Sequence, residues 1–303
     1  MKNERLVVKD NALIDASFNL SLIEQRLMLL AIVEAREIPN LTSDTPVEVR
    51  AVTYREQYNT DSSEAYKQLS EASKQLFNRQ FSYVDRYQQM QAVTVSRWVN
   101  EITYIKERGM VVLYLNRNVI EMITRLENQF TRYHLSQIAT LSSQYSIRLY
   151  EVVIKWLSNG QTQKYSITQL RSLLGIDEHE YRTMSNFKIR VLDRAVKEIN
   201  EKTNIELNYL QSKEGRTISH IKFNVKQKET ELSTTSNVLS MTSKQIEMFS
   251  DRLSKSPNFQ NHFAADVGVN FQTYRQEIEK KLQDNFYVKQ WIDYLVEVGY
   301  SPH

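Results

Sequence analysis

The 303-residue sequence contains no cysteine, only six glycines and only four prolines. The absence of cysteine excludes disulfide bonds, a thiol nucleophile and thiolate metal ligands, and it fits a reducing cytoplasm. So few glycines and prolines argue against long irregular segments. No run of about 18 apolar residues occurs, so we expect no membrane-spanning helix. The charged start of the sequence lacks an apolar core, so we expect no signal peptide.

The motifs of several enzyme classes are also missing. No Gly-x-x-x-x-Gly-Lys-Ser/Thr loop is present, so we do not expect ATP hydrolysis. The five histidines are scattered without His-x-His or His-x-x-x-His pairs, which argues against a metal site. It also argues against a rolling-circle nicking enzyme, a class with paired histidines and a catalytic tyrosine. The sequence therefore predicts no catalytic activity and no cofactor.

The charges are unevenly distributed along a chain of globular composition, with 41% hydrophobic and 25% charged residues. Residues 1–135 carry 17 Lys/Arg and 17 Asp/Glu, whereas residues 136–228 carry 15 and 9, and residues 229–303 carry 7 and 10. A nucleic acid or another polyanion is therefore expected to bind the middle segment.

Helical and strand-like patterns alternate in the first 134 residues. Helices are expected over residues 19–38, 62–79 and 118–128. Strands are expected over residues 47–53, 81–84, 93–99, 102–105 and 111–115. Asn19 is the expected cap of the first helix, and Tyr66 and Phe77 are expected on the apolar face of the second. Gly109 suits the turn of a hairpin because glycine tolerates a positive φ.

The next segment, residues 135–228, has the pattern of three helices followed by a hairpin. The helices are expected over residues 143–158, 166–175 and 185–202, and the strands over residues 205–210 and 217–225. Ser166 and Gln169 form a capping-box pattern at the start of the second helix. Three helices and a hairpin in this order are typical of a winged helix, and the first segment has similar elements in a similar order.

We therefore expect an α+β fold with two tandem winged-helix domains and a small C-terminal helical module. The N-terminal winged-helix domain is predicted over residues 1–134 and the C-terminal one over residues 135–228. A linker rich in serine and threonine is predicted over residues 229–240. Helical patterns then predict an accessory helical module over residues 241–303.

The third helix of the second domain carries a candidate DNA-binding face. At about 100° per residue, its apolar side chains gather on one side and Asn186, Arg190, Asp193, Arg194 and Lys197 on the other. Arginine can pair with guanine and asparagine with adenine, whereas lysine neutralises phosphate. The predicted DNA-binding residues lie on this helix, at its start and in the wing turn: Arg182, Ser185, Asn186, Lys188, Arg190, Arg194, Lys197, Lys213 and Arg216. A basic face on an amphipathic helix can also be a merely solvated surface.

Four stretches carry a resemblance to a known family: Asn11–Ile32, Phe130–Tyr133 with Leu141–Glu151, Phe187–Asn200 and Gly215–Phe223. They resemble, in that order, the opening helix, the domain junction, the recognition helix and the wing of theta-type plasmid replication initiators. This Rep family includes the F-plasmid initiator and the pi protein. The junction and the recognition helix together are specific to it, and the similarity extends over about residues 10–226.

The resemblance implies a function that the residues alone do not. In this family the second winged helix reads direct repeats (iterons) in the major groove, and the first supplies further DNA contacts and the dimer interface. Monomers bind the repeats and help to open adjacent AT-rich DNA, whereas dimers bind an inverted repeat and repress their own gene. The implied partners are the host replication initiator and the replicative helicase. The resemblance points to Asn186, Lys188, Arg190 and Arg194, and it does not extend to residues 238–303.

The expected function is therefore that of a cytoplasmic plasmid replication initiator in monomer–dimer equilibrium. Three alternatives stay open: a winged-helix transcription repressor without origin function, a nicking enzyme, and a protein-interaction module with a solvated basic helix. Tandem repeats beside an AT-rich tract next to the gene favour the initiator over the repressor.

Overall fold

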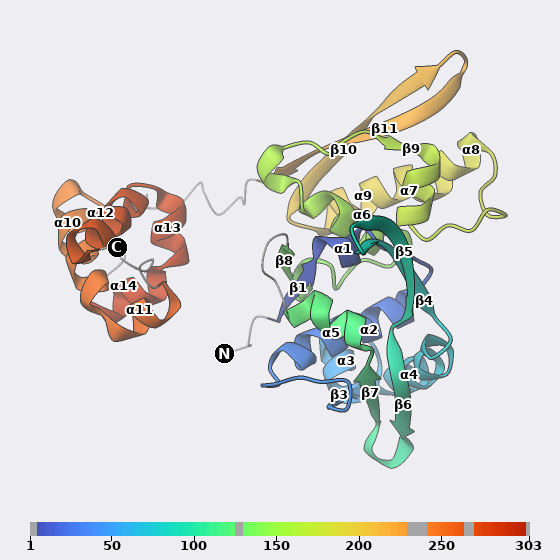
Figure 1. The fold of residues 1–303 in the computed structure, drawn as a ribbon, viewed down its shortest axis with the longest axis horizontal. Helices are drawn as coiled ribbons and strands as arrows, with labels where there is room; N and C mark the ends of the chain where they lie inside the picture. Colours follow the sequence, from blue (N-terminus) through green and yellow to red (C-terminus); the bar gives the residue numbers. More distant parts are fainter. Residues whose placement is uncertain (1–4, 125–129, 229–240, 264–269, 301–303) are drawn as a thin grey trace. The chain divides into compact units, whose positions relative to one another are not determined.

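The computed structural model describes residues 5–124, 130–228, 241–263 and 270–300. The chain divides into two compact units, residues 1–228 and 229–303 (Figure 1). The predicted linker, residues 229–240, lies outside the described residues. The predicted boundary between residues 134 and 135 stays a prediction.

The first unit contains both winged helices. Its first half consists of β1 (Leu6–Asp10), α1 (Asn11–Ile14), β2 (Ser17–Phe18), α2 (Leu22–Arg36), β3 (Pro46–Arg50), α3 (Ala51–Tyr58), α4 (Ser62–Leu76), β4 (Gln80–Tyr87), β5 (Met90–Arg97), β6 (Val99–Ile105), β7 (Met110–Leu115), α5 (Arg117–Thr124) and β8 (Phe130–His134). Its second half consists of α6 (Gln144–Ile154), β9 (Tyr165–Ser166), α7 (Ile167–Leu173), α8 (Met184–Phe187), a π-helical turn (Lys188–Leu192), α9 (Asp193–Lys202), β10 (Ile205–Glu214) and β11 (Thr217–Gln227).

The first winged helix surrounds the buried helix α2. Antiparallel strands β3, β7 and β6 form one sheet, and β2, β4 and β5 form another. The β6–β7 hairpin turns at Gly109, as predicted, with a φ of +54°. A Cβ on Gly109 would stand 2.1 Å from Cε1 of Tyr66, so the Tyr66 ring lies directly on the hairpin turn. Tyr66 is nevertheless 42% exposed and does not lie on the buried side of α4, so its predicted place on that side is wrong.

Several predicted boundaries in this half are wrong. Ser21, not Asn19, caps α2, because Ser21 N–H donates to Glu24 Oε2 at 2.7 Å and Ser21 Oγ accepts from Glu24 N–H. The strand predicted over residues 47–53 ends at Arg50, and the unpredicted helix α3 follows it directly. Phe77 lies just after the last residue of α4 and is 42% exposed, with the Arg97 guanidinium over its ring.

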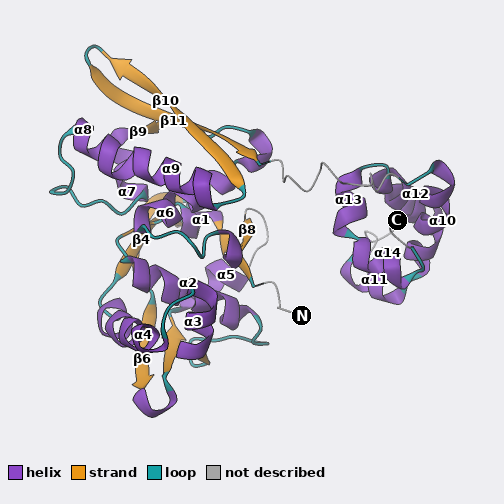
Figure 2. Ribbon diagram, turned by 180° about the vertical axis from the view of Figure 1, so that it is seen from behind, coloured by secondary structure: helices purple, strands orange, loops and turns teal. Residues whose placement is uncertain are grey.

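The second winged helix has the predicted order of three helices and a hairpin (Figure 2). Strand β11 pairs with β10 on one side and with β9 on the other. Ser143 caps α6. At the start of α7, Ser166 Oγ accepts from Gln169 N–H at 3.1 Å as predicted, but among the described hydrogen bonds none returns from Ser166 N–H to the Gln169 side chain, so only half of the expected capping box is present. The last helical run begins at Met184, one residue before the predicted start, with Thr183 as its cap.

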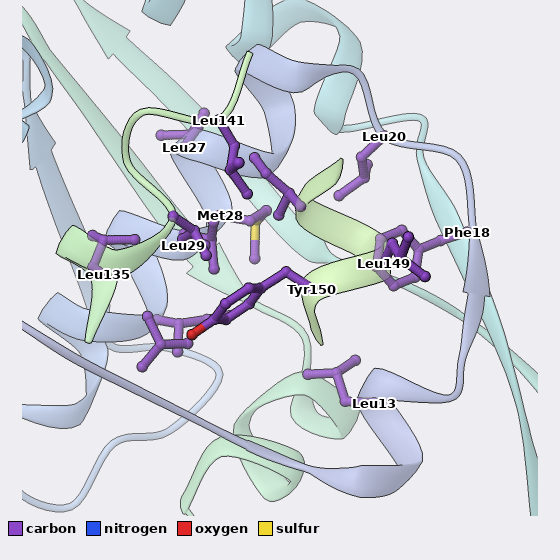
Figure 3. Close-up of a cluster of buried hydrophobic side chains, with 14 of the residues drawn as sticks. Leu13, Phe18, Leu20, Leu27, Met28, Leu29, Leu135, Leu141, Leu149 and Tyr150 are labelled. Carbon is purple, nitrogen blue, oxygen red and sulfur yellow. The ribbon is translucent and has the colours of Figure 1, made fainter. Parts of the chain in front are cut away.

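One hydrophobic core joins the two winged helices. Figure 3 shows side chains from α1, β2, α2 and α6 pointing into the same cluster, among them Leu13, Phe18, Met28 and Leu149. Strands β1 and β8, which the sequence patterns did not predict, pair antiparallel from Leu6 opposite His134 to Asp10 opposite Phe130. Because the shared core contains side chains from both halves of the first unit, the two halves are packed against each other.

The second unit is a separate helical module. It consists of α10 (Ser243–Lys255), α11 (Pro257–His262), α12 (Phe271–Leu282), α13 (Asn285–Gln290) and α14 (Ile292–Glu297). Its own core is rich in aromatic residues, with Phe259 and Trp291 in edge-to-face contact at 5.0 Å between ring centroids. The helix predicted over residues 288–298 is interrupted at Trp291 and forms parts of α13 and α14.

Candidate nucleic-acid interface

The recognition helix is the continuous helical run from Met184 to Lys202. Thr183 Oγ1 accepts a hydrogen bond from Asn186 N–H at 3.3 Å and so satisfies one free donor of the first turn. The predicted apolar side faces the core, and five of its side chains are buried: Phe187, Val191, Leu192, Ala195 and Ile199. Burial of this side fixes which side chains of the helix face solvent.

The opposite side of the recognition helix is basic and exposed. Asn186, Arg190 and Arg194 follow one another at intervals of four residues, which places them in one line along the helix. Within the described part of the chain, the Arg190 and Arg194 guanidinium groups have no hydrogen-bond or ion-pair partner. Lys197 is also exposed and makes a loose ion pair with Glu201 at 3.8 Å. These cations are therefore available to an external anion.

The other predicted residues lie at the start of the helix or in the wing. Ser185 and Arg182 are exposed, and Arg182 Nη2 lies 2.9 Å from His179 Nδ1. Lys188 is half-buried at the edge of the apolar side. Lys213 and Arg216 are exposed around the wing turn, where Gly215 has a φ of +61°.

A groove brings the start of the recognition helix close to the wing. Side chains from α7, the loop before α8 and β11 line it, including Arg182, Met184 and Thr217. Arg182 and Thr217 line the same groove, and Thr217 directly follows Arg216 of the wing turn. Arg182 and the wing turn therefore lie on the same side of the domain. The wing strand also contacts the helix directly, because Tyr209 Oη donates to Asp193 Oδ1 at 2.5 Å. Burial and the Asp193 carboxylate raise the pKa of Tyr209, so its hydroxyl keeps this proton.

Arg171 on α7 holds the loop that leads into the recognition helix. Its guanidinium donates to the carbonyl oxygens of Tyr181, Asp177 and Glu180 at 3.1, 2.9 and 2.6 Å, respectively. It also lies 5.6 Å from the ring centroid of Phe187, the first buried residue of the helix. Arg171 was not among the predicted residues, since its role depends on carbonyl groups that no side-chain pattern reveals.

The other end of the recognition helix is anchored to the loop that precedes α6. Glu198 Oε1 accepts from the Ser142 N–H and Oγ–H at 2.7 and 2.6 Å and from Lys202 Nζ at 2.8 Å. Burial opposes ionisation of Glu198, but the hydrogen bonds from Lys202 and Ser142 outweigh it and lower the pKa to about 2. The carboxylate is therefore charged at neutral pH and holds the helix against the loop.

A buried polar cluster connects the two winged helices. Glu151 on α6 binds Lys9 of β1 at 2.5 Å, Tyr133 of β8 at 2.6 Å and Arg148 at 2.9 Å. Burial alone would raise the pKa of Glu151, but the charges of Lys9 and Arg148 hold it below its ordinary value.

The Arg148 guanidinium in turn donates to the carbonyl oxygens of Ile14 and Ala16 in the first domain and Leu173 in the second. It also lies over the Phe18 ring, 3.9 Å from the centroid. The cluster therefore satisfies its own charges while it joins β1, β8, α6 and α7.

The described residues contain no group of three or more histidine, aspartate or glutamate side chains that could hold a metal ion. Within the same part of the chain, no helix is both long and apolar enough to cross a membrane. The features that the site does offer are an exposed basic helix and a basic wing tip.

Comparison with known proteins agrees with this arrangement. Residues 6–154 match the family model described as "Initiator Replication protein, WH1", and residues 166–225 match the model "Initiator Rep protein, WH2". The crystal structure of the Pi initiator protein in complex with iteron DNA is similar to this chain, with a TM-score of 0.63 and 25% identity. The match covers 76% of this chain and all of the Pi chain.

Curated relatives from Escherichia coli point to the same family. The PI protein is 34% identical over 148 residues, which are 44% of this chain and 48% of that protein. A replication initiation protein is 23% identical over 234 residues, which are 74% of this chain and 70% of that protein. The chain, with its two winged helices, belongs to the family of theta-type plasmid replication initiators.

Proposed function

We propose that this protein initiates plasmid replication by binding direct repeats at its origin through the second winged helix. The observation that carries the proposal is the exposed line of Asn186, Arg190 and Arg194, whose two guanidinium groups are free among the described residues. The Pi initiator, which has a similar fold, was solved with iteron DNA. An exposed basic helix beside a basic wing is the kind of surface that binds double-stranded DNA.

In the proposed complex the recognition helix lies in the major groove. Asn186, Arg190 and Arg194 contact base edges, because their donors suit adenine and guanine. Phosphates are bound by the side chains at the helix start and its edges and by the helix N-terminus: Arg182, Ser185, Lys188 and Lys197. Lys213 and Arg216 at the wing tip contact the backbone or the minor groove.

The first winged helix supplies an accessory DNA contact in this proposal. Lys106 and Arg108 are exposed in the short 3-10 helix at the tip of the β6–β7 hairpin. They occupy the same position in their hairpin as Lys213 and Arg216 in the second wing. Their substitution by alanine should weaken binding uniformly across sequences and reduce its salt dependence.

Self-association is proposed at strand β5, the edge of the β2–β4–β5 sheet. No strand within the described ranges pairs with the outer edge of β5, so its backbone donors and acceptors are available to another strand. Val93 and Val95, on one face of this strand, are 70% and 62% exposed, and the cross-strand partner Val84 is 60% exposed. A second copy that pairs antiparallel with β5 would place its own strand beside Val93 and Val95 and reduce their exposure.

Monomers would then bind the repeats and promote opening of adjacent AT-rich DNA, and dimers would bind an inverted repeat and repress the gene. Recruitment of the host replication initiator and the replicative helicase completes the proposed role. The C-terminal module is acidic overall, so we assign it a partner-binding or self-association role rather than DNA contact. Deletion of residues 238–303 should then impair replication while DNA affinity is kept.

The test is a gel shift and footprint of the purified protein on the DNA that flanks its own gene. Scrambled competitor and two salt concentrations separate specific from nonspecific binding. We expect protection of tandem repeats that resists competitor. Binding to a single promoter-proximal inverted repeat would favour a transcription repressor instead, and binding that collapses with competitor and salt would refute both roles.

A further inference from the structure

The basic side of the recognition helix contains one large apolar side chain. Ile189 is 64% exposed, whereas the neighbouring aliphatic residues Val191 and Leu192 are at most 1% exposed. The core is therefore filled without Ile189. Single exposed apolar residues are common on protein surfaces, so exposure alone assigns no role. Ile189 is distinguished by its position beside Asn186 and Arg190, which are proposed to face DNA.

Ile189 is surrounded by exposed polar residues on the helix surface. Asn186 precedes it by three residues and Asp193 follows it by four, which are the spacings of neighbours on a helical surface. Arg190 is the next residue and is also exposed. Any group that approaches Asn186 and Arg190 from outside therefore also meets the Ile189 side chain.

The backbone at Ile189 is unusual. Residues Lys188–Leu192 form a π-helical turn inside the otherwise α-helical run. Such a turn contains one residue more than an α-helical turn and is common at functional sites. Here it lies in the N-terminal half of the recognition helix, the half that contacts base edges in helix-turn-helix proteins. Ile189 and Arg190 both face outward within this single turn.

The thymine C5 methyl group is an apolar group in the major groove that an isoleucine side chain can contact. Guanine, cytosine and adenine present hydrogen-bond donors and acceptors there, and thymine presents an acceptor and its C5 methyl group. We propose that Ile189 contacts the C5 methyl group of a thymine in each repeat, between bases read by Asn186 and Arg190. This inference rests on the proposed binding of repeats and adds that one thymine is recognised by its methyl group.

Deoxyuridine scanning of one repeat tests the contact, because uracil lacks only the methyl group of thymine. Each thymine is replaced in turn, and affinity is measured for the full-length wild type, Ile189→Ala and Leu210→Ala. Leu210 is a matched control, since it is 58% exposed on β10, outside the recognition helix. Ile189 is exposed, so its substitution should leave the fold unchanged.

We expect one thymine at which uracil weakens wild-type binding about fourfold, the factor for one methyl-sized apolar contact. The same replacement should have no effect on Ile189→Ala and the full effect on Leu210→Ala. An equal loss for wild type and Ile189→Ala at every thymine, or no loss anywhere, would overturn the contact while repeat binding stands. Failure of the wild type to bind the repeats at all would overturn the proposed function as well.

Discussion

Gly175 of the second winged helix lies directly against the backbone of Phe18 in the first. A Cβ on Gly175 would stand 2.0 Å from the Phe18 carbonyl oxygen, and Gly175 has a φ of +68°. The same Cβ would stand 3.0 Å from the carbonyl carbon of Phe18. A side chain at position 175 would therefore push the two winged helices apart.

Gly175→Ala should destabilise the protein by more than about 2 kcal/mol, since a left-handed backbone and a backbone clash act together. The matched control is Gly215→Ala, which also has a positive φ, of +61°, but has no heavy atom within 4 Å of the new Cβ. Gly215→Ala should lower the free energy of unfolding by only about 1 kcal/mol. Urea unfolding of both variants measures the difference, and equal losses would contradict the close approach to Phe18.

Arg190→Ala and Arg194→Ala should each weaken binding to the repeats by about 1–3 kcal/mol if the arginine reads a base, and should relax specificity at that base. An arginine that binds phosphate should instead lower affinity for all sequences and reduce the salt dependence. Binding isotherms at two salt concentrations distinguish these cases.

Lys226→Ala is the control for both arginine variants, because Lys226 is an exposed cation on β11 that pairs with Glu206 at 3.0 Å. It should bind the repeats like the wild type. Unchanged affinity of the Arg190→Ala, Arg194→Ala double variant would rule out the proposed docking face.

Arg148→Ala should lower the free energy of unfolding by about 3–5 kcal/mol, because it leaves part of a buried ion cluster without its partner. Three carbonyl oxygens, of Ile14, Ala16 and Leu173, lose their donor at the same time. Arg117→Ala is the control, since Arg117 is exposed and pairs loosely with Glu121 at 3.8 Å. Its expected effect is at most about 0.5 kcal/mol. Chemical denaturation compares the two, and a loss for Arg148→Ala as small as that of the control would contradict the role of the cluster.

The pH dependence of stability should contain a contribution from Glu198. Its pKa is lowered to about 2 in the folded protein, so its stabilising effect is complete above the ordinary pKa of 4.5 and disappears as the pH falls towards 2. The difference in urea midpoint between wild type and Glu198→Gln should therefore be smaller at pH 3 than at pH 7.

The exposed residue Glu201, which only pairs loosely with Lys197, provides the control variant Glu201→Gln. This variant should follow the wild type at both pH values. If the gap between wild type and Glu198→Gln stayed constant with pH, the hydrogen bonds from Ser142 and Lys202 would not carry the stabilisation.

Val93→Lys should shift the protein towards the monomer, because a lysine on an edge strand disfavours pairing with a strand of a second copy. Sedimentation at several concentrations measures the shift, and binding to direct repeats should persist while binding to an inverted repeat weakens. Val52→Lys, at a 54% exposed position on α3, serves as the control. An unaltered dimer in Val93→Lys would locate self-association elsewhere.

The sequence predicted the second winged helix better than the first. Its helices have clear apolar stripes, and Ser166 caps α7 as expected. In the first, α3 was missed because its residues, from Ala51 to Tyr58, are mostly polar and follow a strand without a turn residue. Strands β1 and β8 were missed because each is defined by its pairing with a distant strand rather than by its own pattern.

Some residues of the candidate site could also be predicted from the sequence, and others could not. The exposed side of the recognition helix followed from its period alone, and eight of the nine predicted residues are exposed, with Lys188 half-buried. Arg171 and Glu198 act on backbone groups of loops, Tyr181 and Ser142 among them, so a side-chain pattern could not reveal them. The nine predicted DNA contacts themselves stay predictions until binding is measured.

The buried cluster of Lys9, Arg148 and Glu151 has a consequence for the geometry of the target DNA. Because charges and carbonyl groups from both winged helices meet inside it, the two basic hairpin tips belong to one compact unit. In the proposed complex, the distance between the two tips then determines how many base pairs, and what rotation about the duplex axis, lie between their DNA contacts. Insertion of a few base pairs within a repeat would place the two contacts on different sides of the duplex, even with every contacted base unchanged.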